Sequence, residues 1–165
     1  MAAATSKKKA PARRRDRPSP RQRLLDAATK LFTEEGIRVI GIDRILREAD
    51  VAKASLYSLL GSKDNLVVAY LEELDEQYRS RWGERAAKAP DADSKILALF
   101  DMAIEEEPQK EFRGSPFLNA AAEYPRPETE SEERIVETCR NHRLWMHSTI
   151  CLLYTSDAAD DSLRV

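Results

Sequence analysis

Residues 42–60, IDRILREADVAKASLYSLL, contain two short stretches of helical periodicity separated by a tight turn. The first stretch repeats apolar residues at the spacing of one helix face, which makes a stripe of Ile42, Ile45, Leu46 and Ala49. The second stretch has a stripe of Leu56, Leu59 and Leu60, and Val51 lies in the turn. Two amphipathic helices packed through such a turn form the helix-turn-helix pattern. We therefore predict an all-α fold organised around a helix-turn-helix.

The second of these helices has a small, polar outer face. Lys53, Ala54, Tyr57 and Ser58 share this face at helical spacing, with Ser55 beside them. A cationic face of small and hydroxyl-bearing residues suits entry into a DNA major groove, where base edges offer donors and acceptors. The predicted DNA contacts on the two helices are Arg44, Lys53, Ala54, Ser55, Tyr57 and Ser58.

Together with its flanks, the stretch resembles the tetracycline-repressor (TetR) family of bacterial transcriptional regulators. The resemblance rests on RLLDAATKLFTEEG at 23–36, IDRILREADVAKASLY at 42–57 and GSKDNL at 61–66. It implies a DNA-binding domain at 19–64, a helical ligand-binding and dimerisation domain after it, a double-stranded DNA operator, a small apolar effector and a homodimer. It also implies a phosphate contact for Lys63, which follows the N-cap Ser62 at the start of a helix. A solvated first-turn lysine is the alternative interpretation.

A second block, FRGSPFLNAAAEYP at 112–125, resembles the ligand domain of one branch of the same family. From this resemblance we expect residues 65–153 to form a partial helical regulatory domain. The resemblance implies an apolar effector pocket with walls formed by Phe100, Phe112, Phe117 and Trp145. For each of these aromatic residues taken singly, ordinary core packing is the alternative.

Several positions in the helix-turn-helix differ from the family pattern, including Leu59 and Leu60, which stand where an aromatic pair is more usual. Gly41 and Ala52 stand where Thr and Ser often cap the two helices, and neither has a side-chain oxygen for that purpose. Asp50 stands where the family usually has Gly, and Asp in a left-handed conformation costs about 1 kcal/mol. These differences leave the predicted fold intact and weaken the case for tight DNA binding.

The two ends of the chain have compositions of their own. Residues 1–18 contain KKK at 7–9 and RRR at 13–15, which predicts a disordered basic arm. Such an arm either follows the DNA backbone or serves as a solubilising tail. Residues 154–165, YTSDAADDSLRV, lack an apolar stripe and are predicted to be an atypical tail. Because family members continue with two more long helices, we expect a C-terminal truncation, which leaves open whether this chain dimerises.

Charge divides the sequence into a basic and an acidic part. Residues 1–63 contain 15 Lys/Arg and 7 Asp/Glu, a net charge of +8, whereas residues 64–165 contain 12 and 22, a net charge of −10. This distribution is expected when one end meets phosphate. No apolar run is long enough to cross a bilayer and no secretory signal is recognisable, so a cytoplasmic protein is expected.

The patterns favour a sequence-specific DNA-binding transcriptional regulator, a ligand-responsive repressor, over two other classes of protein. One alternative is a truncated helical ligand-binding or interaction domain that binds DNA weakly and without specificity. The other is an enzyme, for which the chain offers no phosphate-cradling glycine loop and no Ser/His/Asp set. Cys139 and His142 lie one helical turn apart without a second ligand pair, so we expect a structural role and neither metal nor cofactor. Cys139 and Cys151 are expected to be free thiols.

Overall fold

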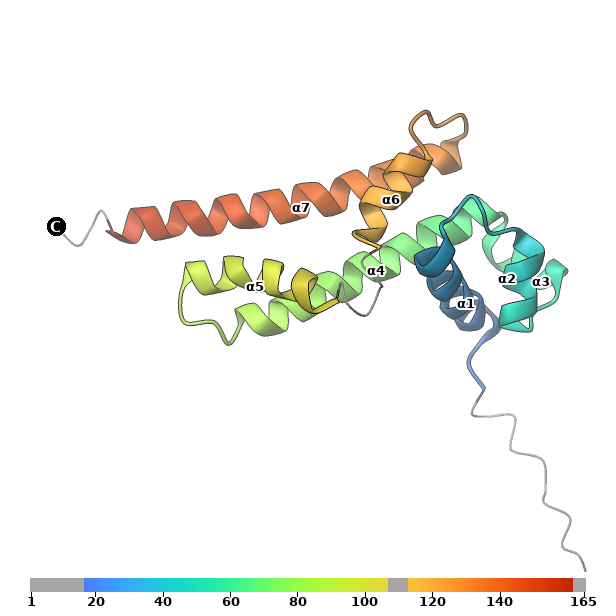
Figure 1. Ribbon diagram of the computed structural model, residues 1–165, viewed down its shortest axis with the longest axis horizontal. Coiled ribbons are helices and arrows are strands. Elements are labelled where there is room, and N and C mark those ends of the chain that lie inside the picture. Colours follow the sequence, from blue (N-terminus) through green and yellow to red (C-terminus); the bar gives the residue numbers. More distant parts are fainter. Residues whose placement is uncertain (1–16, 107–112, 162–165) are drawn as a thin grey trace, which may run out of the picture.

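The computed structural model describes residues 17–106 and 113–161, with side chains up to 155, and this part of the chain is all-helical (Figure 1). Its helices are α1 (Pro20–Glu35), α2 (Ile42–Ala49), α3 (Lys53–Leu60), α4 (Lys63–Ala86), α5 (Ala92–Glu106), α6 (Pro116–Glu123) and α7 (Glu130–Asp161). The predicted all-α fold is confirmed. The predicted basic arm falls almost entirely within residues 1–16, outside the described residues.

Local signals in the sequence set the limits of α1. The Ser19 hydroxyl accepts a hydrogen bond from the Gln22 N–H at 3.1 Å, and Pro20 occupies the first turn, where its missing N–H costs nothing. The helix ends at Gly36, whose φ of +99° strains any residue with a Cβ. Between these ends α1 buries a continuous apolar face against α2, α3 and α4, made of Leu24, Leu25, Ala27, Ala28, Leu31 and Phe32.

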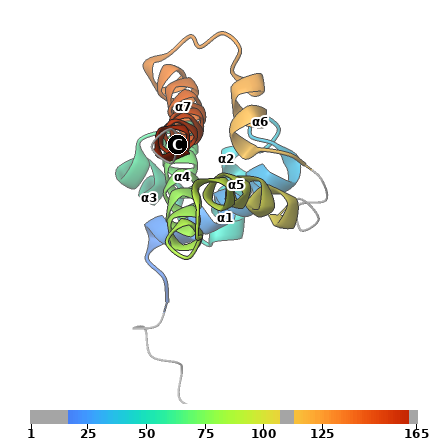
Figure 2. The ribbon, with the colours of Figure 1, turned by 90° about the vertical axis from the view of Figure 1, so that its left-hand side faces the viewer.

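The helix-turn-helix unit, α1–α3, shares one core with the rest of the chain. The first three turns of α4 bury Leu66, Val67 and Leu71 completely. The same cluster includes Phe117 from α6 and Ile135 from α7. Figures 1 and 2 show α4 leaving the helix-turn-helix unit and running beside α7. The boundary predicted at residue 64 therefore falls inside a continuous helix and core.

The longest helix, α7, extends further than the sequence suggested. It opens at Thr129, whose hydroxyl accepts from the Glu132 N–H at 3.2 Å. The helix then continues through the predicted tail boundary at 154 to Asp161. No Gly or Pro interrupts residues 128–161, and Ala158 and Ala159 favour helix even without an apolar stripe. The atypical composition of the tail is therefore not accompanied by a break in the helix.

Candidate nucleic-acid interface

Helix α3 presents the polar face that its sequence predicts. Leu56 is completely buried and anchors the helix. Lys53, Ala54, Tyr57 and Ser58 are exposed, and Ser55 is half-buried beside them. The predicted apolar stripe is wrong at Leu59, which is 45% exposed. The reason is that α3 is only eight residues long and packs just one narrow face, around Leu56, against the core. The exposed face of α3 is thus wider than predicted.

The turn between α2 and α3 depends on Asp50 in a left-handed conformation, with φ 49° and ψ 54°. Arg23 of α1 supports this turn, because its Nη1 donates to the carbonyl oxygens of Ala49 at 2.9 Å and Asp50 at 2.6 Å. A guanidinium at the C-terminus of α2 both satisfies open carbonyl groups and complements the helix dipole. The Asp50 carboxylate pairs in turn with Arg17 and Arg23. No local pattern predicts the contact of Arg23, since its partners lie 26 and 27 residues away.

Two of the predicted basic contacts are paired with acidic side chains of the same unit. The Arg44 guanidinium donates to both carboxylate oxygens of Glu35. The Lys53 ammonium lies 3.6 Å from the Asp43 carboxylate, and both side chains are exposed. Exposed pairs of this kind contribute little to stability, so both cations can exchange a carboxylate for a phosphate at small cost.

Lys63 is placed differently from the other candidates. Its ammonium group donates to the Ile37 carbonyl oxygen at 2.7 Å, and burial lowers the pKa of this half-buried lysine. A direct phosphate contact would require that bond to open. The phosphate role of Lys63 stays a prediction, and what the geometry shows is a bond to the loop between α1 and α2.

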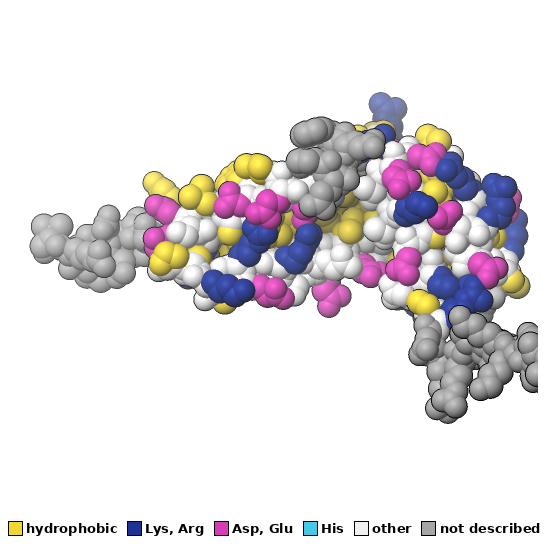
Figure 3. All heavy atoms as spheres, turned by 60° about the horizontal axis from the view of Figure 1, so that its bottom comes forward, with side chains coloured by type: hydrophobic (Ala, Val, Ile, Leu, Met, Phe, Trp, Pro, Cys, Tyr) yellow, Lys and Arg dark blue, Asp and Glu magenta, His cyan; other side chains and the backbone are white. Residues whose placement is uncertain are grey.

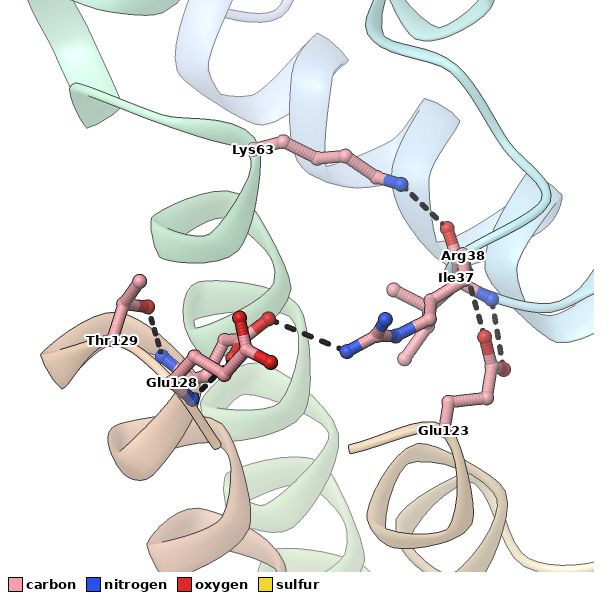
Figure 4. Close-up of polar contacts among 7 residues, drawn as sticks. Ile37, Arg38, Lys63, Glu123, Glu128 and Thr129 are labelled. Atoms are coloured by element: carbon pink, nitrogen blue, oxygen red, sulfur yellow. Dashed lines mark hydrogen bonds and ion pairs between the residues drawn. The ribbon is translucent and has the colours of Figure 1, made fainter. Parts of the chain in front are cut away.

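That loop is held on its other side by α6, as the close-up in Figure 4 shows. Glu123, the last residue of α6, accepts the backbone N–H of Ile37 at 3.0 Å and that of Arg38 at 2.6 Å. The Arg38 guanidinium lies over the Tyr124 ring and donates to Glu132 of α7 at 3.3 Å. Sequence reasoning did not anticipate Glu123, because about 85 residues separate it from its partners. We call Glu123 and its two N–H donors the α6 clamp.

Behind the clamp, α4, α5, α6 and α7 line a cavity of about 400 Å³ with a mainly apolar wall. Its lining includes Leu74, Tyr78, Phe117, Ala121, His142 and Met146. Of the predicted pocket aromatics, Phe117 lines it. Trp145 does not, and it packs instead against the rings of Tyr78 and Trp82. Phe112 lies outside the described residues.

Phe100 was predicted to form a pocket wall, but its side chain is 53% exposed on the outer face of α5. The reason is that α5 is apolar on more than one side, and Leu99 and Met102 occupy the inner face. Cys139 and His142 are both buried, and His142 bonds to Asp75. The two thiols are free, and burial raises the pKa of Cys139 to about 11. Within the described ranges no three His, Cys, Asp or Glu side chains gather as a metal site.

Basic side chains occur along the helix-turn-helix end of the molecule. In Figure 3 dark-blue Lys and Arg side chains lie along the edge formed by the helix-turn-helix unit. Residues 24–70 match the family described as bacterial regulatory proteins, tetR family. This part of the chain belongs to the tetR family. None of the helices in the described part is long and apolar enough to span a membrane.

Individual relatives agree with this assignment. The chain is 36% identical over 58 residues to the transcriptional regulator HbdR of an Aromatoleum species, covering 35% of this chain and 25% of HbdR. It is 29% identical over 105 residues to the transcriptional regulator LmrA of Bacillus subtilis, covering 62% of this chain and 56% of LmrA. The chain thus spans a quarter to about half of these relatives.

Solved structures of tetR family members share the fold. SCO4454, a TetR-family transcriptional regulator from Streptomyces coelicolor, superposes with a TM-score of 0.67 and 38% identity, covering 76% of this chain and 65% of that one. Reduced NemR of Escherichia coli superposes with a TM-score of 0.65 and 21% identity, covering 84% and 73%, a likeness of fold alone.

Proposed function

We propose that this protein is a sequence-specific DNA-binding transcriptional regulator, a repressor that a small ligand releases from its operator in the cytoplasm. The observation that carries the proposal is the exposed polar face of α3. Lys53, Tyr57 and Ser58 stand out from a helix that the buried Leu56 fixes to the core. Such a rigidly held face is what direct reading of base edges in the major groove requires.

The function of the relatives supports the same conclusion, since HbdR and LmrA are both transcriptional regulators. Operators of helix-turn-helix proteins consist of paired half-sites about one helical turn apart. We therefore include a homodimer in the proposal, with one α3 in each half-site. A truncated ligand-binding domain with weak DNA affinity predicts instead a monomer that binds all sequences alike.

The link between ligand and DNA runs through α6. The residues Phe117 and Ala121 of this helix line the cavity, and Glu123 at its end forms the α6 clamp on the loop that leads into α2. A ligand that shifts α6 by a fraction of an ångström changes both bonds of the clamp. Ligand and DNA then select different positions of the helix-turn-helix unit, which gives a coupling free energy between the two sites.

The proposal is tested by fluorescence anisotropy with duplexes from the region upstream of the gene and with scrambled duplexes of equal length. Lys53→Ala is expected to weaken binding to the specific duplex about tenfold and to reduce the salt slope by about one. Lys88→Ala, which changes an exposed lysine between α4 and α5, is the matched control and should bind as the wild type does. Equal losses in the two variants, or no preference of the wild type for any upstream duplex, would contradict the proposal.

A further inference from the structure

A histidine and a carboxylate form a fixed pair at the wall of the cavity. His142 on α7 is 6% exposed, and its Nδ1 lies 2.7 Å from Oδ1 of Asp75 on α4. The other oxygen of Asp75, Oδ2, accepts from Arg79 Nε at 2.8 Å. Because a carboxylate oxygen accepts hydrogen bonds, the Nδ1 of the imidazole is the nitrogen that carries a proton and donates it.

The other ring nitrogen, Nε2, is left without a protein partner among the described residues, while His142 lines the cavity. Burial lowers the pKa of His142 although the bond to Asp75 opposes this shift, so the ring is neutral near pH 7. Nε2 of a neutral ring with a proton on Nδ1 is an acceptor. A ligand that brings a donor can satisfy this acceptor in place of water.

The walls around this acceptor suit a flat ring. Phe117 stacks on the imidazole with ring centroids 3.7 Å apart and an angle of 8° between the planes, which fixes the orientation of the histidine. Tyr78 meets the same imidazole edge-on at 5.2 Å. Leu74, Ala121 and Met146 add apolar surface to the lining, which also includes the charged residues Arg81, Glu106 and Arg143. Aromatic compounds gain from both edge-on and stacked contacts with such walls.

We propose that the cavity binds a small aromatic compound with a hydroxyl group, a phenol, whose O–H donates to Nε2 of His142. A carboxylate could pair with Arg81 or Arg143 in the same lining, but it is ionised at neutral pH and brings no proton to Nε2 of His142. The role of the phenol as an effector rests on the function proposed above, whereas its binding does not.

The test uses the full chain without DNA and two probes of the same ring system, 2-naphthol and 2-methoxynaphthalene. Isothermal titration calorimetry should give an affinity about tenfold higher for 2-naphthol, which has the donor. His142→Phe keeps the stacked ring but not the acceptor and should remove this preference. His147→Phe, at an exposed position on the same helix, is the matched control and should retain it.

Equal affinity of the wild type for both probes would overturn the proposal, as would a preference that persists in His142→Phe. If thermal melts show that His142→Phe does not fold, the ¹⁵N resonance of Nε2 in the wild type gives the answer. It should shift with 2-naphthol and not with 2-methoxynaphthalene, and the absence of that difference would also overturn the proposal. Binding of 2-naphthol without release of the operator would contradict the effector role alone and leave the site standing.

Discussion

The α6 clamp yields the most specific prediction, which concerns Glu123→Ala. This change removes the acceptor of two backbone N–H groups, one of them at Ile37, whose side chain is 3% exposed. Hydrogen bonds to a charged group contribute about 1.5–3 kcal/mol each, and the bond at the exposed Arg38 falls at or below the low end. We therefore expect the free energy of unfolding to fall by about 2–4 kcal/mol.

The same variant should also weaken the communication between cavity and operator. Couplings between two ligand sites are typically about 1–3 kcal/mol, and we expect the loss of the clamp to remove about 1 kcal/mol. In practice, the factor by which ligand lowers DNA affinity should fall about fivefold, since about 1.4 kcal/mol corresponds to a factor of ten. Both the lower stability and the weaker coupling should occur without any change in the exposed DNA-contacting face of α3.

Two measurements on one set of variants check these numbers. Urea unfolding followed by circular dichroism gives the stability, and fluorescence anisotropy with and without 2-naphthol gives the coupling. Glu137→Ala, at an exposed glutamate of α7, serves as the control and should match the wild type in both. A Glu123→Ala protein within 0.5 kcal/mol of the wild type, a margin typical of neutral surface changes, would refute the energetic argument. Unchanged coupling in that protein would refute the role of α6 in communication.

The remaining predictions concern the turn, the buried histidine and the thiols. Asp50→Gly should be about 1 kcal/mol more stable than Asp50→Ala in urea unfolding, because both lose the carboxylate and only Ala is strained at φ 49°. Since burial lowers the pKa of His142, its stabilising effect is complete above about pH 6.5 and is lost as the pH falls through the lower, folded pKa. Melting temperatures should therefore drop more steeply from pH 7 to pH 5 in the wild type than in His142→Gln, and parallel curves would contradict this. With its pKa raised to about 11, Cys139 should react with iodoacetamide at pH 8 far more slowly than the exposed Cys151, as mass spectrometry of the labelled peptides can show.

What could be predicted from the sequence depended on signals that act over a few residues. Ser19, Pro20 and Gly36 mark the ends of α1 because caps and positive φ are local requirements. The exposed face of α3 followed from helical spacing around Leu56. The left-handed Asp50 followed from its place in the turn.

Features that depend on packing between distant segments could not be predicted in this way. Helix α5 is apolar on several sides, so its periodicity alone did not show that Phe100 faces outward. The pairing of His142 with Asp75 joins residues 67 positions apart, and the α6 clamp joins residues even more distant. A charged residue such as Glu123 looks like solvated surface in the sequence, because its two partners are backbone groups that carry no side-chain signature.

The continuous core across the first turns of α4 has a consequence for protein engineering. Chimeric regulators are made by joining the DNA-binding domain of one protein to the ligand-binding domain of another. In the sequence, residue 64 looks like the natural junction between the two. In this chain a junction at residue 64 would separate Leu66, Val67 and Leu71 from the α1 surface that they cover, or from the α6 and α7 residues behind them. A DNA-binding domain moved into another protein must therefore include the start of α4. The ligand-binding domain it is joined to must offer side chains shaped like Phe117 and Ile135 for α4 to pack against.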